Sequence, residues 1–249
     1  MLLLGGFVAG SAVRRSRTRQ ALIERDSIAQ DTTLVRAGIV QGVVRRAVVP
    51  EGREQETPPD VLRRRIDNLK PGSYIDDIIN EQDSALYRWH EKLDDALRVY
   101  IEPASTIAGF DPVYPDLARN AFAEWSQAGF PIRFTFIYDS SSADIMIRWK
   151  DRFPPSEGQR IGVTERIQTS RFWIAAARID VANHDSTGRQ LSTRTVGGIL
   201  RHEIGHALGL NHASDQTSVM YRESATTTIA PSDRATLRLL YLLPPGSLR

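Results

Sequence analysis

The eleven residues HEIGHALGLNH, from His202 to His212, carry three of the five histidines of this 249-residue chain. His202 and His206 are four residues apart, so on a helix both imidazoles lie on one face, close enough to share one metal ion. Gly209 can adopt the left-handed conformation that turns a chain sharply, which would bring His212 back to the same ion. Neutral imidazoles suit a catalytic Zn²⁺, which keeps a fourth position for water. The spacing therefore predicts one zinc ion held by His202, His206 and His212.

Glu203 places a base beside this predicted metal. It lies about 100° around the helix from His202, so its carboxylate stands next to the ion rather than on it. There it can take the proton of a zinc-activated water and pass it to the leaving amine of a peptide. We therefore predict a zinc-dependent metalloendopeptidase, a hydrolase, with Glu203 as the general base. A non-catalytic zinc-containing binding or regulatory module is the alternative, and the base at position 203 argues against it.

HEIGHALGLNH resembles the extended motif HExxHxxGxxH of the metzincin metalloproteases, and most of all the matrixins in their bacterial form. SVMY, residues 218–221, is similar to the Met-turn of the family, which implies that Met220 lies under the zinc as a hydrophobic floor. RFTFIYDSSSADIMIRW and the closing helix with Tyr241 are also similar to the family. The resemblance runs from about Leu97 to Leu243 and implies proteolysis by a metzincin catalytic domain.

The chain also departs from the family pattern. It has no cysteine, so the cysteine switch of animal matrixins is absent. The loop from Lys150 to Phe172 contains no histidine, so we expect no second, structural zinc site. Arg222 stands where astacin-like relatives place a tyrosine ligand, whereas Tyr221 directly follows the methionine, as in matrixins. These departures predict a single zinc ion per chain.

The elements that must position these residues follow from the spacing of apolar side chains. The resemblance implies an α/β (α+β) fold: a twisted, mostly parallel sheet with an antiparallel edge strand, an active-site helix, the Met-turn and a C-terminal helix. Residues 224–229 would shape a specificity pocket. Strands are predicted at 97–101, 132–138, 143–149, 160–167 and 172–182, helices at 114–129, 192–209 and 231–243, and the edge that pairs with an extended substrate at Arg160, Ile161, Gly162, Val163 and Thr164.

Three segments are predicted along the chain: an apolar signal-like or anchor segment (1–13), a mostly helical N-terminal extension (14–92) and a matrixin-like catalytic domain (93–249). MLLLGGFVAGSAV is too short to span a bilayer as a helix, but it has the length of a signal-peptide core. A truncated longer signal or anchor is the alternative. Both favour export, either secreted or held at the cell envelope by a membrane tether, although the arginines that follow tend to keep a segment in the cytoplasm.

The extension is either an inhibitory pro-segment or a packing and tethering element. Without a thiol, an inhibitory ligand for the open zinc position would be a carboxylate or an imidazole. Acidic residues are common on any solvated helix, which favours the packing role. The candidate inhibitory ligands are Asp76, Asp77, Glu81, Asp83 and His90.

Three further expectations concern other ligands and partners. Asp180, Asn183 and Asp185 have the ligand types of a Ca²⁺ site, although not a known spacing, while His184 and His90 are expected on the surface. The 32 basic and 30 acidic residues are interleaved, so a nucleic-acid partner is not expected. The partner we expect is a protein or peptide substrate, and the sequence leaves the oligomeric state undetermined.

Overall fold

The computed structural model describes residues 44–49, 57–90, 96–223 and 226–248. The signal-like segment 1–13 and residues 14–43 of the predicted extension lie outside the described residues. No helix in the described ranges is long and apolar enough to cross a membrane.

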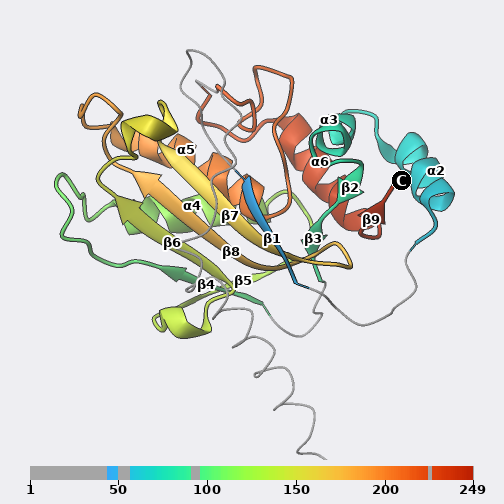
Figure 1. The fold of residues 1–249 in the computed structure, drawn as a ribbon, viewed down its shortest axis with the longest axis horizontal. Coiled ribbons are helices and arrows are strands. Elements are labelled where there is room, and N and C mark those ends of the chain that lie inside the picture. Colours follow the sequence, from blue (N-terminus) through green and yellow to red (C-terminus); the bar gives the residue numbers. More distant parts are fainter. Residues whose placement is uncertain (1–43, 50–56, 91–95, 224–225, 249) are drawn as a thin grey trace, which may run out of the picture. The chain divides into compact units, whose positions relative to one another are not determined.

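A seven-stranded sheet forms the centre of the fold (Figure 1). Its strands are β1 (Val44–Val49), β3 (Arg88–Trp89), β4 (Leu97–Ile101), β5 (Phe134–Ile137), β6 (Ile145–Lys150), β7 (Gly162–Thr169) and β8 (Trp173–Ala182). They follow the order β1-β7-β8-β6-β4-β5, and β3 pairs with β8 beside that path. Only β7 and β8 run antiparallel to each other. The predicted fold class, a mostly parallel sheet with an antiparallel strand, is confirmed.

Helices α4 (Tyr114–Ser126) and α5 (Thr193–Ala207) form the layer that carries the site. α5 packs against α4, β7 and β8, and almost every side chain from Val196 onward is buried. Ser192 caps the start of α5, since its hydroxyl accepts the backbone N–H of Thr195 at 3.1 Å. Short 3₁₀ helices occupy Ser140–Ser142 and Pro155–Glu157. The apolar residues that recur along these two helices thus bury the HEIGH segment between α4 and strands β7 and β8.

The described part of the extension is not a separate unit, and it is not mostly helical. It contains α2 (Pro59–Leu69), α3 (Ile75–Glu81) and β2 (Ala85–Leu86), besides β1 and β3 of the main sheet. β2 pairs with β9 (Gly246–Ser247) near the C-terminus, and α3 packs on α6 (Pro231–Leu242). Leu62, Ile75 and Ile78 are fully buried in the same hydrophobic cluster as the catalytic layers.

The described residues 57–90 belong to the same compact unit as the later residues, Gly38–Arg249. The physical reason is the small number of apolar side chains in the extension. They cannot enclose a core alone and instead complete the core of the later residues.

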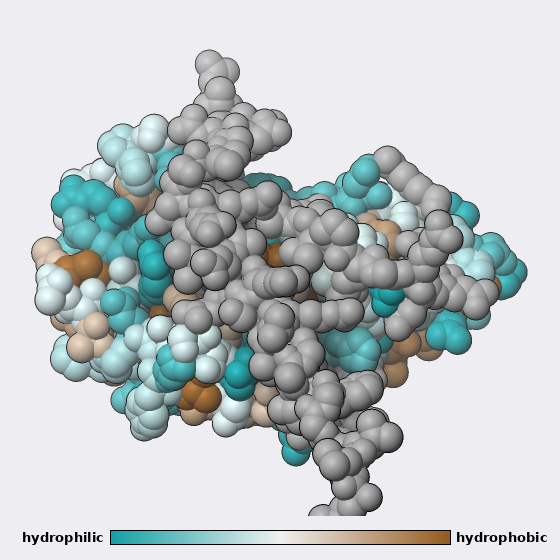
Figure 2. Space-filling model, turned by 60° about the horizontal axis from the view of Figure 1, so that its bottom comes forward, coloured by the Kyte–Doolittle hydropathy of each residue, from teal (hydrophilic) through white to brown (hydrophobic). Residues whose placement is uncertain are grey.

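Exposed apolar side chains are scattered over the described surface. Leu69, Val113 and Leu242 lie far apart in sequence, while Phe136 and Tyr138 are neighbours on β5 and the residues after it. On the face in Figure 2, hydrophilic residues surround single hydrophobic ones. Isolated apolar residues of this kind are ordinary on soluble surfaces and need no partner to explain them.

Candidate metal centre

The end of α5 is a tight turn centred on Gly209. The N–H of Leu210 donates to the carbonyl of Gly205 at 3.0 Å, and the N–H of Gly209 donates to that of His206 at 3.0 Å. This is the Schellman arrangement, which requires a left-handed residue after the helix, and Gly209 has φ +110°. A Cβ at Gly209 would also come within 2.5 Å of the carbonyl oxygen of Tyr87. The predicted turn glycine is therefore confirmed by both conformation and space.

Side chains from three other elements bind the last carbonyls of α5. Arg166 of β7 donates to the carbonyl of His206 at 3.1 Å, and Trp89 of β3 donates to that of Ala207 at 2.8 Å. The hydroxyl of Tyr241, in α6, donates to the carbonyl of Leu208 at 3.0 Å. Carbonyls at a helix end lack partners within the helix, so these donors stabilise a buried end and fix its position.

The turn brings the three predicted ligands together. His202, His206 and His212 form the only group of three or more such residues among the described ones that could hold a metal, with ligand atoms within 4.8 Å of one another. The Nε2 atoms of His202 and His206 are 3.1 Å apart. Two nitrogens on one tetrahedral Zn²⁺ stand about 3.3 Å apart, given Zn–N bonds of about 2.0–2.1 Å. The spacing therefore fits zinc.

Each imidazole has an acceptor on its Nδ1 atom. Nδ1 of His202 faces the carbonyl of Val219 at 2.7 Å, and Nδ1 of His206 faces that of Leu210 at 2.9 Å. Nδ1 of His212 faces Oε1 of Glu81 at 2.7 Å. A carbonyl only accepts, so the proton sits on Nδ1 and the lone pair on Nε2, as metal binding through Nε2 requires.

Burial also keeps the imidazoles of His202 and His206 neutral. It lowers the pKa of His202 to about 3, and it lowers the pKa of His206 well below its ordinary value. A metal site needs neutral rings, because a protonated nitrogen has no lone pair to offer. The donor set, its tautomers and its burial therefore all fit a bound zinc ion.

Glu203 follows His202 on α5, and its side chain lies against β7. Thr164 directs its hydroxyl at the glutamate, 2.7 Å from Oε2 and 2.9 Å from the backbone carbonyl. A Cβ at Gly162 would overlap the carboxylate, so the absence of a side chain there makes room for Glu203. Oε1 is buried and has no hydrogen-bond partner among the described residues. Burial raises the pKa of Glu203 to about 8, and a nearby dication would oppose that rise.

Met220 is fully buried and packs against α5 at Gly205. A Cβ at Gly205 would overlap the sulfur of Met220, so the glycine inside HEIGH admits the methionine side chain. The sequence suggests the floor position of Met220, but the reason for Gly205 appears only in the structure.

Asp233 of α6 organises the Met-turn and was not singled out by the sequence. Its carboxylate accepts the hydroxyl of Ser218, the N–H of Val219 at 3.1 Å and the N–H of Ala230 at 2.7 Å. Val219 in turn supplies the carbonyl that binds His202. The signal in the sequence is weak, because an acidic residue in the first turn of a helix is common.

The residues predicted to line the substrate edge take two kinds of position. Gly162 and Thr164 contact Glu203, while Arg160 pairs with Glu157, and Ile161 and Val163 are buried. β7 is not the last strand of the sheet. β1 pairs with it in parallel, with Val44 opposite Thr164 and Val49 opposite Thr169. Of the predicted edge, only Thr164 lies within this pairing.

The three candidate calcium ligands do not converge. Asp180 lies among the cations of Arg148, Lys150 and Arg178, at 3.4–3.8 Å. The amide oxygen of Asn183 lies 3.0 Å from Nδ1 of His184, and its amide nitrogen donates to the carbonyl of Ala108 at 2.6 Å. Asp185 instead accepts bonds from Thr187 and Arg189 in its own turn. These oxygens already serve other partners, so the structure gives no support to the predicted calcium site.

His184 is less exposed than expected, with 13% of its side chain accessible. Its Nδ1 lies 3.0 Å from the amide oxygen of Asn183 and 2.7 Å from a carboxylate oxygen of Asp151. A Cβ at Gly109 would come within 2.8 Å of its ring. The turn that carries His184 packs against the loop around Gly109. The local sequence ANHDSTG does not indicate this contact.

The candidate inhibitory ligands have other partners. Asp76 pairs with Lys70, Asp77 accepts the N–H of Ser214, and the ring of His90 packs on Trp173 at 4.6 Å, although His90 is exposed as expected. Asp83 has φ +57° in the turn after α3. The fifth candidate, Glu81, reaches the metal centre, but there it binds Nδ1 of His212 and not the predicted metal position.

Arg222 pairs with Glu81 at 2.9 Å. Burial alone would raise the pKa of Glu81, but the hydrogen bonds from His212 and the charge of Arg222 lower the pKa to about 2. Glu81 is therefore an ionised acceptor, which fixes the proton of His212 on Nδ1.

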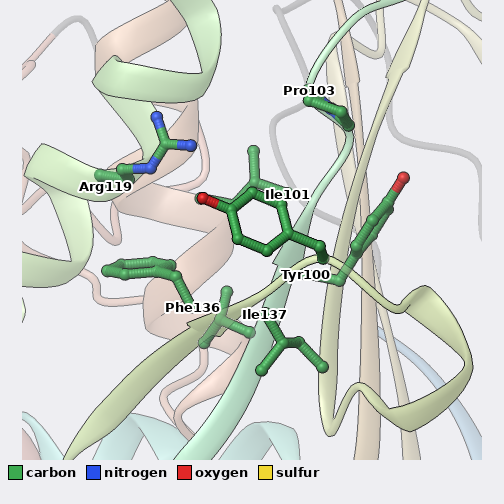
Figure 3. Close-up of a pocket in the computed structure, with 8 residues that line it drawn as sticks. Tyr100, Ile101, Pro103, Arg119, Phe136 and Ile137 are labelled. Atoms are coloured by element: carbon green, nitrogen blue, oxygen red, sulfur yellow. The ribbon is translucent and has the colours of Figure 1, made fainter.

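A pocket elsewhere on the molecule contains none of these residues. It is lined by β4 and β5 residues such as Tyr100, Ile101, Phe136 and Ile137, with Arg119 of α4 at its side (Figure 3). It has no group of metal ligands, so the metal centre is the candidate functional site.

The fold and the three-histidine group together are those of a domain of the metzincin type. The chain matches the matrixin family of peptidases over residues 88–242. This match covers well over half of the chain, and the chain therefore belongs to the matrixin family.

Individual relatives agree with this assignment. Over 112 residues the chain is 29% identical to metalloendoproteinase 1-MMP of Arabidopsis thaliana, covering 41% of the chain and 30% of the relative. Over 133 residues it is 30% identical to human matrix metalloproteinase-27, covering 43% and 23%. Over 114 residues it is 28% identical to karilysin of Tannerella forsythia, covering 41% and 23%. The aligned part thus spans less than a third of the length of each of these relatives.

Proposed function

We propose that this protein is a zinc-dependent endopeptidase that uses His202, His206 and His212 as zinc ligands and Glu203 as its general base. The observation that carries the proposal is the arrangement at the end of α5. Three buried imidazoles gather their ligand atoms within 4.8 Å of one another, and the residue after the first of them, Glu203, is a buried carboxylate held against β7. A binding module has no need of that carboxylate, whereas peptide hydrolysis does.

Zinc bound at the triad would supply an activated water and polarise the scissile carbonyl. The residues of the chain do the remaining work. Glu203 accepts the proton of the attacking water on its carboxylate and passes it to the leaving amine. Thr164 holds Oε2 in place, which leaves Oε1 as the oxygen that takes the proton. Met220 and Gly205 keep the helix face packed, so that the two histidines of α5 stay oriented.

The substrate would be an extended protein or peptide segment that adds to β7 by main-chain hydrogen bonds. Gly162 and Val163 precede the stretch that pairs with β1, and Gly162 adjoins Glu203. A segment bound there would lie beside the base. The predicted specificity wall at 224–229 includes Ser224 and Ala225, which lie outside the described residues, and Ile229, which is buried.

A chelator experiment tests the proposed function. The full chain should cleave an unfolded protein such as casein, a zinc chelator should abolish the cleavage, and added zinc should restore it. Protein that holds zinc in the triad but cleaves no substrate in a peptide library would overturn the endopeptidase proposal and favour a binding module.

Removing β1 is expected to increase activity on peptides. β1 uses the backbone groups of Thr164–Thr169 that an incoming strand would need, so it competes with the substrate within the same chain. A variant that begins at Thr57 removes β1 but keeps α2 and α3. If the edge is covered about 90% of the time, kcat/KM should rise about tenfold. Steady-state kinetics at equal zinc content measure this change, and an unchanged kcat/KM would show that β1 does not obstruct the substrate.

A further inference from the structure

Glu81 belongs to α3, which precedes the region that matches the matrixin family. Its carboxylate accepts two hydrogen bonds from one residue: Nδ1 of His212 at 2.7 Å and the backbone N–H of His212 at 2.9 Å. Arg222, which follows the Met-turn, donates to the same carboxylate at 2.9 Å. The carboxylate thus holds both the ring and the backbone of the third ligand.

α3 holds the loop around His212 at two further points. Gln82 donates to the amide oxygen of Asn211 at 2.7 Å, and both side chains are buried. Asp77 accepts the backbone N–H of Ser214 at 2.8 Å and its hydroxyl at 2.9 Å. Residues 211, 212 and 214 therefore each have a partner from α3 or its C-terminal cap.

α3 itself is anchored in the core. Ile75 and Ile78 are fully buried, and the helix packs against α6. The Glu81 side chain is 31% exposed, while that of His212 is 9% exposed. The hydrogen bond between them is therefore partly shielded from water, and its acceptor is held by a fixed helix rather than by a loose tail.

We propose that Glu81 is a positioning residue for the zinc ligand His212, and that the segment around α3 is a permanent part of the metal centre. His202 and His206 are oriented by backbone carbonyls, but His212 lies beyond the helix and depends on a carboxylate. Carboxylate–histidine–metal arrangements fix the ring, fix its tautomer and make the ligating nitrogen more basic. This inference rests on the proposed zinc site, and it replaces the idea that α3 carries an inhibitory ligand.

The test compares zinc affinity in full-length Glu81→Ala, Glu81→Gln and Asp76→Ala variants by competition with a chromophoric chelator. Glu81→Ala should weaken zinc binding by about 10- to 100-fold. Glu81→Gln keeps an acceptor of the same length and should lose less. Asp76→Ala is the matched control: it removes a carboxylate of the same helix that pairs with Lys70 rather than with the loop around His212, and it should keep near wild-type affinity.

A spectroscopic readout separates positioning from general support of the fold. Cobalt(II) loaded in place of zinc should show an altered visible spectrum in both Glu81 variants and an unaltered one in Asp76→Ala. Equal zinc affinity and equal cobalt spectra in wild type and a folded Glu81→Ala variant would overturn the inference. If Glu81→Ala fails to fold, a cobalt spectrum of Glu81→Gln that equals the wild-type spectrum would overturn the inference.

The affinity comparison decides the role of Glu81 whether or not the protein hydrolyses peptides. Wild-type protein that binds zinc but lacks peptidase activity refutes the proposed function alone. Wild-type protein that binds no zinc overturns the function and the inference together.

Discussion

Replacing Glu203 by glutamine is expected to lower kcat for peptide hydrolysis by about 10²–10⁴ while zinc content stays near that of the wild type. Glutamine keeps the length of the side chain and an oxygen that can accept the bond from Thr164, which lies 2.7 Å from Oε2. It cannot accept a proton at neutral pH. Because Glu203 is not among the three grouped ligands, removal of its charge leaves the imidazoles in place.

Peptide kinetics and elemental analysis on the same preparation measure this prediction, and a thermal melt with zinc present checks the fold. The matched control is Glu157→Gln, which changes a carboxylate near Gly162 that pairs with Arg160 and does not bind Glu203. Its activity should stay close to the wild type. If Glu203→Gln hydrolysed peptides at the wild-type rate, another group would have to activate the water.

Replacing His206 by alanine is expected to empty the metal site and remove all measurable peptide hydrolysis. His206 occupies the middle of the site, with its ring centroid 4.7 Å from that of His202 and 4.8 Å from that of His212. Two imidazoles bind zinc far more weakly than three, because each missing ligand removes a coordination bond. Zinc content should fall from about one ion per chain to near zero after dialysis.

The control for this experiment is His90→Ala, since His90 is exposed and packs on Trp173 away from the triad. Its zinc content should equal that of the wild type. His202→Ala and His212→Ala should repeat the result of His206→Ala. Two tightly held zinc ions in the wild type, or one ion retained by His206→Ala, would contradict a single three-histidine site.

The sequence alone predicts the local elements and the ligand set. Strand 97–101 and the start of helix 114–129 follow from alternation and helical spacing, and the structure has them at Leu97–Ile101 and Tyr114–Ser126. The HEIGHALGLNH spacing predicts that His202, His206 and His212 meet, and they do. These predictions succeed because a helix and one glycine turn relate residues only a few positions apart, so local geometry determines their distances.

Only the tertiary structure decides what surrounds the ligands. Glu81 and His212 are 131 residues apart, and Arg166 reaches the carbonyl of His206 from a different layer. No repeating pattern of residues in the sequence connects positions that are so far apart. The sequence names Glu81 only as one acid among several, because a charged residue on a helix looks the same in the sequence whether or not it has a partner.

The same reason explains why the sequence did not reveal the surroundings of Asp180 and His184 or the packing of the extension. Asp180 has calcium-type oxygens, but neighbouring strands surround it with cations, and His184 is covered by a loop from residue 109. The extension has too few apolar residues for a core of its own, which the sequence indicates. The extension completes the core of the later residues through contacts between surfaces that lie far apart in the chain. Only the packing of the whole unit determines these contacts.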